Sequence, residues 1–236
     1  MTDIITDYID NDITQDFEDF ADEIIQCLGA QDLIANTDFQ SQLSNLNASL
    51  SGDVEKGAEI SNSNNTLSFS PKIGSYDQID LAQGGDIIGG MHTHHDAGYP
   101  MFSAEDIYKL YTYKKYANSN VSQYDVLSVV ITPNGTYMVK LIDFSLLGFL
   151  FQQATVESGS LEKAFRDLNR KLQKDYKSNN DSNDFMKKFL QALEDLKTKY
   201  NLTKVPIQLY EKNNATNTFK KVKLTASETL TKTPCN

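Results

Sequence analysis

The sequence predicts an α+β fold in which helices flank a mixed β-sheet, with further helices at the N-terminal end and a helical pair and a β-hairpin at the C-terminal end. Three observations support this prediction. Apolar residues recur at three- and four-residue steps near both ends of the chain, as in amphipathic helices. Short apolar runs bounded by Gly, Asn, Ser and Pro fill the middle, as in strands. The chain has 236 residues, of which 39% are hydrophobic, and can therefore bury a sizeable core.

The first part of the chain, residues 1–50, is acidic and is expected to be helical. A stripe of apolar residues predicts one amphipathic helix, which Gly29 is expected to end. A second helix is predicted over residues 37–50. The stripe that predicts the first helix comprises Ile13, Phe17, Phe20, Ala21, Ile24, Ile25 and Leu28.

The middle part, residues 51–145, is expected to form the sheet and one helix. Asn134 and Gly135 separate two apolar runs and predict a hairpin, because an Asn-Gly pair tolerates positive φ. Residues 104–117 carry apolar residues at helical spacing and predict a helix. The predicted strands lie at residues 58–60, 66–69, 87–90, Val126–Thr132 and Thr136–Ile142.

The last part, residues 146–236, changes character again. Two helices are predicted, over residues 146–177 and 184–200, with a polar loop between them. A closing hairpin is predicted from residues 205–211 and 218–224.

Charge and hydropathy restrict the partners of the chain. It has 22 Lys and Arg against 32 Asp and Glu, a formal net charge of −10. Nucleic-acid binders need a basic footprint, so no nucleic-acid partner is expected, and docking on an anionic membrane is equally disfavoured. No apolar run approaches the ~18 residues of a membrane span, so no membrane insertion is expected.

The cysteines and the first residues indicate a compartment. Cys27 and Cys235 lie far apart and form neither a CxxC motif nor a disulfide framework. Cys235 falls within residues 225–236, which are rich in Thr, Lys and Pro and are expected to fray. The acidic first residues lack the basic and apolar regions of a signal peptide. The expected location is therefore a reducing cytoplasm, or the chain is exported by an apparatus that needs no signal peptide.

All three histidines of the chain, His92, His94 and His95, lie within four positions. Random placement would produce such a cluster roughly a few times in ten thousand. The cluster ends a predicted strand, on which residues two apart share a face, so His92 and His94 can hold one ion while His95 points away. Imidazole is a common zinc ligand.

The segment from His92 to Asp106 has the form H-x-H-x(8)-S-x-x-D, in which Ser103 is the serine. This pattern resembles the metal-binding signature of the JAMM (JAB/MPN) metallopeptidases, and the chain is most similar to the bacterial JAB-like branch. The apolar strand ending in Gly before the histidines also fits. The resemblance covers residues 53–145 and implies a JAB/MPN-like, cytidine-deaminase-like mixed sheet for them.

The resemblance also implies a role for each residue. His92, His94 and Asp106 would hold Zn²⁺ with water in the fourth position, and Ser103 would hydrogen-bond that water or the developing oxyanion. The family uses a glutamate on an earlier strand as general base. Glu55 is the first choice, because Ala58 supplies the small residue that commonly follows three positions later.

Glu59 is the alternative base, since it is four positions from Glu55 and shares its face of the strand. The chain departs from the family pattern after the second histidine, where His95 replaces the usual proline. His95 and Asp96 are therefore alternative ligands. The Ser103-x-x-Asp106 pattern also predicts a capping box at a helix start, and both readings can hold together.

The activity that the resemblance implies is zinc-dependent hydrolysis of a peptide or isopeptide bond in a peptide or protein substrate. Such a chain could process proteins or act as a toxin-type effector, with a partner or immunity protein on its flanking helices. The alternative is a non-catalytic JAB/MPN-fold binding or scaffold module with a structural or vacant metal site. A fourth protein ligand, from His95 or Asp96, would favour this alternative.

Overall fold

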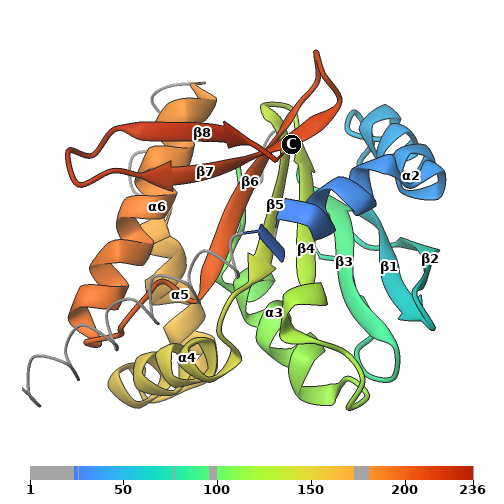
Figure 1. Cartoon of the computed structure of the whole chain (residues 1–236). Coiled ribbons are helices and arrows are strands. Elements are labelled where there is room, and N and C mark those ends of the chain that lie inside the picture. The colour runs from blue at the N-terminus through green and yellow to red at the C-terminus, as the bar shows by residue number, and fades with distance from the viewer. Residues whose placement is uncertain (1–23, 26, 77, 96–99, 173–180, 236) are drawn as a thin grey trace, which may run out of the picture.

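An eight-stranded mixed sheet runs through the described residues of the computed structural model, which are 24–25, 27–76, 78–95, 100–172 and 181–235 (Figure 1). The strands are β1 (Lys56–Ser63), β2 (Thr66–Ile73), β3 (Ile87–Thr93), β4 (Leu127–Thr132), β5 (Gly135–Leu141), β6 (Ile207–Asn213), β7 (Thr218–Leu224) and β8 (Leu230–Pro234). Their order in the sheet is β2-β1-β3-β4-β5-β6-β7-β8. β3 and β4 are parallel, and the other neighbouring strands are antiparallel.

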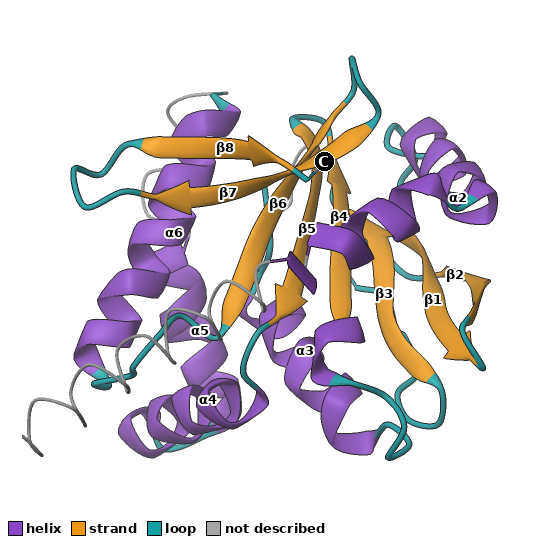
Figure 2. Cartoon of the chain, viewed as in Figure 1, coloured by secondary structure: helices purple, strands orange, loops and turns teal. Residues whose placement is uncertain are grey.

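Helices cover both faces of this sheet (Figure 2). They are a helix at residues 27–35, α2 (Thr37–Ala48), α3 (Ala104–Tyr116), α4 (Phe144–Ser158), α5 (Leu161–Leu172) and α6 (Ser182–Lys199). Residues an odd number apart in a strand point to opposite faces. On β5, Tyr137 bonds to Ser182 at the start of α6, whereas Lys140 points toward Gly29 in the first helix. The first helix and α6 therefore lie on opposite faces.

Most elements match the sequence predictions. The strands, the hairpin at Asn134-Gly135 and the closing hairpin are present, as are the helices predicted over residues 37–50, 104–117 and 184–200. The mixed α+β class is confirmed. β5 pairs with β6, so the sheet continues across the expected boundary between residues 145 and 146.

The predicted end of the first helix is wrong. Residues 27–35 are all helical, and Gly29 lies within them without a positive φ. Its missing side chain instead leaves room for Lys140, whose Nζ lies 2.5 Å from where a Cβ on Gly29 would be. The predicted stripe residues before Ile24 lie outside the described residues.

The single helix predicted over residues 146–177 is also wrong, because two helices replace its described part. α4 ends at Gly159, which adopts φ 82° and so provides the left-handed cap that favours glycine. Ser160 then caps the next helix, since its Oγ accepts a hydrogen bond from the Lys163 N–H at 3.2 Å.

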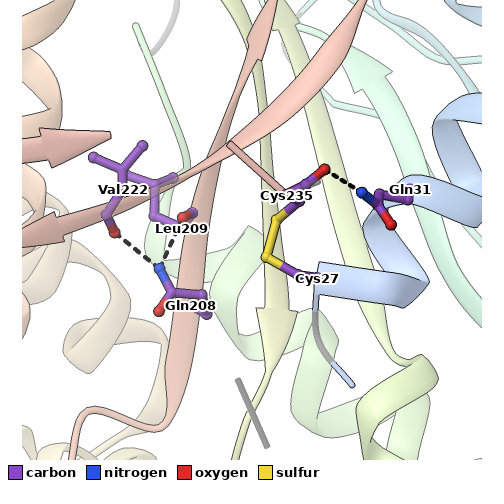
Figure 3. Close-up of a disulfide and its surroundings, with 6 residues drawn as sticks. All are labelled: Cys27, Gln31, Gln208, Leu209, Val222 and Cys235. Atoms are coloured by element: carbon purple, nitrogen blue, oxygen red, sulfur yellow. Dashed lines mark hydrogen bonds between the residues drawn. A yellow bond between two sulfur atoms is a disulfide. The ribbon is translucent and has the colours of Figure 1, made fainter. Parts of the chain in front are cut away.

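The predictions for the last residues and for the cysteines are wrong as well. Residues 230–234 form β8, which pairs with β7 along the edge of the sheet. Cys235 follows β8 and forms a disulfide with Cys27, 208 positions away (Figure 3). Gln31 also donates a side-chain hydrogen bond to the Cys235 carbonyl. The sequence pattern could not reveal this pairing, because it depends on how the two ends meet in the fold.

Among the described residues, no helix combines the length and the hydrophobicity that crossing a bilayer requires.

Candidate metal centre

The interior strand β3 carries His92, and His94 follows directly after the strand ends at Thr93. β3 pairs with β1 on one side and β4 on the other, so that Gly57, His92 and Val130 lie opposite one another. A Cβ at Gly57 would meet the Met91 carbonyl and lie 3.1 Å from the His92 Cβ, so glycine lets β1 approach the histidine strand closely. The His94 N–H bonds to the Ile131 carbonyl at 2.9 Å, which continues the alignment with β4 past the end of β3.

The first turn of α3 supplies the carboxylate. Ser103 is the N-cap, and its Oγ accepts a hydrogen bond from the Asp106 N–H at 3.1 Å. Asp106 Oδ2 in turn accepts bonds from the Ser103 N–H at 2.7 Å and from its hydroxyl at 2.8 Å. This is the capping box that the sequence predicts. It holds the Asp106 side chain back over the helix start, toward the histidines.

The Nε2 atoms of the two histidines and the carboxylate of Asp106 converge at this point. Nε2 of His92 lies 3.1 Å from Asp106 Oδ1 and 2.9 Å from His94 Nε2, and His94 Nε2 lies 3.6 Å from Asp106 Oδ2. Ligands at about 2.0–2.1 Å from a tetrahedral zinc ion are about 3.3 Å apart. The ligand atoms of the three residues lie within 4.8 Å of one another, and two nitrogens with one carboxylate oxygen are a donor set that suits zinc and similar divalent ions.

The site is nearly closed to solvent. The side chains of His92 and His94 are 6% and 5% exposed, and that of Asp106 is 13% exposed. Histidine ligands usually also bond through their second ring nitrogen, but Nδ1 of His92 has no hydrogen-bond partner among the described residues. Packing and the contacts of Nε2 therefore orient the His92 ring.

The electrostatics of the site favour a positive charge between these groups. Burial alone would raise the pKa of Asp106, but His92, His94 and the Ser103 N–H together lower this pKa far below its usual range. Burial would likewise lower the pKa of His92, but the charges of Asp106 and Glu55 raise it overall. A bound cation would balance the negative charges of Asp106 and Glu55, so that the histidines could stay neutral.

The two candidate bases have different surroundings. Glu55 immediately precedes β1, is buried, and lies close enough to His92 to raise the pKa of that imidazole. Glu59 lies within β1 and accepts a hydrogen bond from the Ala82 N–H at 2.7 Å, with Lys72 Nζ at 3.2 Å. The charge of Glu55 therefore acts on His92, whereas the Glu59 carboxylate holds the segment around Ala82 and contacts Lys72.

His95 is not part of the convergent group. Nδ1 of His95 lies 3.1 Å from the Leu50 carbonyl oxygen, after α2, which directs this ring away from the other two histidines. Asp96 lies outside the described residues. The group of potential ligands found in the described part of the chain comprises His92, His94 and Asp106.

Asn169 in α5 also reaches the first turn of α3, and the sequence predictions missed it. Its side chain bonds to the Ala104 N–H and to Glu105, 65 and 64 positions away. No local pattern could indicate a contact at that separation.

Comparison with protein-family models, with curated proteins and with solved structures finds no match to this chain.

Proposed function

We propose that the chain is a zinc-dependent hydrolase of peptide or isopeptide bonds, with a JAB/MPN-like arrangement of β1, β3, β4 and α3 around its metal site. The convergence of His92, His94 and Asp106 carries this proposal. The donor set has three protein ligands, which is typical of catalytic zinc, whereas structural zinc takes four. Among the described residues, His95 is turned elsewhere and supplies no fourth ligand.

Each protein group has a part in the proposed reaction. A zinc ion in this site would lower the pKa of a water in its open position to about 7 and polarise the substrate carbonyl. Glu55 accepts the proton that the attacking water loses and returns it to the leaving amine. Glu55 takes this role rather than Glu59 because its charge acts on His92, whereas Glu59 contacts Ala82 and Lys72.

Ser103 has two roles in this proposal. Its hydroxyl donates to Asp106 at 2.8 Å, so in the resting site it fixes the carboxylate. A hydrogen bond to the developing oxyanion would require this hydroxyl to turn away from Asp106, while the Ser103 N–H keeps its own bond to that carboxylate.

Metal analysis tests the proposal. Protein purified without a histidine tag should contain about one zinc per chain, because three converging ligands suffice for a catalytic site. The His92→Ala/Asp106→Ala double variant should contain none. His95→Ala is the matched control and should keep the metal, since His95 faces Leu50. A wild-type protein that binds no zinc even after zinc is added would contradict the proposal and leave the scaffold function.

We further infer that the folded chain works outside a reducing cytoplasm. Disulfides persist in oxidising compartments and are rare in the cytosol. The pairing of Cys27 with Cys235 therefore favours the exported alternative over the cytoplasmic one.

A further inference from the structure

The C-terminal helices hold the segment that carries the metal ligand Asp106. Asn169 lies in α5, is buried, and faces the start of α3. Its Oδ1 accepts a hydrogen bond from the Ala104 N–H at 2.7 Å, and its Nδ2 donates to Glu105 Oε2 at 2.8 Å. These two residues lie directly between the N-cap Ser103 and Asp106. The amide of Asn169 thus bonds to the turn of backbone from which the ligand projects.

A second contact holds the other side of the same turn. Phe102, which immediately precedes the N-cap, is buried, and its ring centroid lies 6.1 Å from that of Phe189 in α6. Ala104 is also buried, and with Leu168 and Leu193 it lines an apolar gap between α3, α5 and α6. The start of α3 is therefore fixed by polar contacts to α5 and by apolar contacts to α6.

We propose that Asn169 is a positioning residue for the metal site, and that α5 thereby completes a centre whose ligands all come from residues 92–106. This inference rests on the proposed zinc site. The Ala104 N–H is one of the first-turn donors that have no partner within a helix, so an acceptor from outside fixes the direction of α3. Asp106 Oδ1 is 3.1 Å from His92 Nε2, and a small rotation of α3 would separate them. Groups that orient metal ligands typically contribute about 10- to 100-fold to metal affinity.

The zinc affinity of the full chain tests this role, measured by competition with a chromophoric chelator. Asn169→Leu keeps the number and branching of the side-chain heavy atoms and removes both hydrogen bonds, and it should weaken zinc binding about tenfold. Gln208→Leu is the matched control. It removes an amide that donates to the Leu209 and Val222 carbonyls (Figure 3). Gln208 pairs with Lys140 and shares its face of the sheet, whereas His92 lies in register with Tyr137 on the opposite face. Gln208→Leu should leave the zinc affinity unchanged, even if its melting temperature falls as much as that of Asn169→Leu.

Reversing the direction of the hydrogen bond between residues 169 and 105 distinguishes a positioning role of Asn169 from a general loss of packing. Asn169→Asp still accepts from the Ala104 N–H but places a carboxylate against Glu105, so it should also weaken zinc binding. Adding Glu105→Gln supplies an amide donor to that carboxylate and should restore the affinity. Neither substitution changes a zinc ligand, so recovery would show that the bond between the two helices sets the affinity.

Four results would overturn the inference. Unchanged zinc affinity in Asn169→Leu would remove the positioning role and leave the zinc site intact. An equal loss of affinity in Gln208→Leu, or no recovery in the Asn169→Asp/Glu105→Gln pair, would reduce the effect to overall stability. A wild-type chain that binds no zinc would instead overturn the proposed function and this inference together.

Discussion

Glu55 acts on His92, whereas Glu59 contacts Ala82 and Lys72, and this difference predicts how the two residues respond to substitution. Glu55→Gln should keep zinc and lower turnover by about 10²- to 10⁴-fold, because an amide cannot accept the proton. Glu59→Gln should keep turnover and lose part of the contact with Ala82 and Lys72. Zinc content, cleavage of a peptide or isopeptide library and melting temperature, measured on both variants, check this prediction.

The two variants are isosteric and serve as controls for each other. Full turnover in Glu55→Gln, together with loss of turnover in Glu59→Gln, would reverse the assignment of the base. Loss of zinc in Glu55→Gln would instead mean that Glu55 is needed for metal binding, which its place beside His92 does not predict.

At the level of residues, local spacing along a strand and at a helix start was enough to predict which residues form the candidate metal site. His92 and His94 share a face because they are two apart, and Asp106 turns back because Ser103 caps its helix. Spacing places Glu55 and Glu59 on one face, and the fold distinguishes them, because Glu55 acts on His92 while Glu59 contacts Ala82 and Lys72. It could not indicate Asn169, whose partners lie 65 and 64 positions away in the chain.

At the level of elements, the sequence predictions failed where one residue type can serve two purposes. Gly159 ends a helix through its positive φ, but Gly29 lies inside a helix to admit Lys140. The break at Gly159 was missed because apolar residues continue on both sides of it at helical spacing. β8 was missed because its sequence is polar, as the exposed edge of a sheet allows.

The first helix buries Lys140, and this predicts a pH-dependent stability. Burial lowers the pKa of Lys140 from 10.5 to about 8, although Asp125 and Asp32 oppose the shift. Between these pH values the unfolded chain binds more protons than the folded chain, so the free energy of unfolding rises with pH. The rise due to Lys140 should be about 2 kcal/mol from pH ~8 to pH ~10, measured by urea denaturation.

Lys140→Met isolates this contribution, because it keeps an unbranched side chain and removes the titrating group. The variant should lack the rise that Lys140 contributes to the wild type. If wild type and variant change in parallel over this pH range, Lys140 keeps an ordinary pKa in the folded protein, and the first helix does not bury it as described.

At the level of the whole molecule, the disulfide joins segments that the sheet alone does not bring together. The first helix covers one face of the sheet, and its buried residues Ala30, Leu33 and Ile34 anchor it there. β8 is the edge strand at the end of the sheet opposite β2. Because Cys27 precedes the anchor residues and Cys235 follows β8, the bond closes nearly the whole described chain into one loop.

This loop predicts a large loss of stability when the disulfide is removed. A disulfide that spans 208 positions restricts the unfolded state strongly. Cys27→Ser/Cys235→Ser should therefore lower the free energy of unfolding by about 2–4 kcal/mol. In urea denaturation, a reducing agent should destabilise the wild type by a similar amount and leave the double variant unaffected, which excludes a general effect of the reductant.

Thiol titration should find no reactive cysteine in the oxidised protein and both after reduction. Reactive thiols in protein folded under oxidising conditions would instead mean that the chain functions with reduced cysteines, which would support a cytoplasmic location.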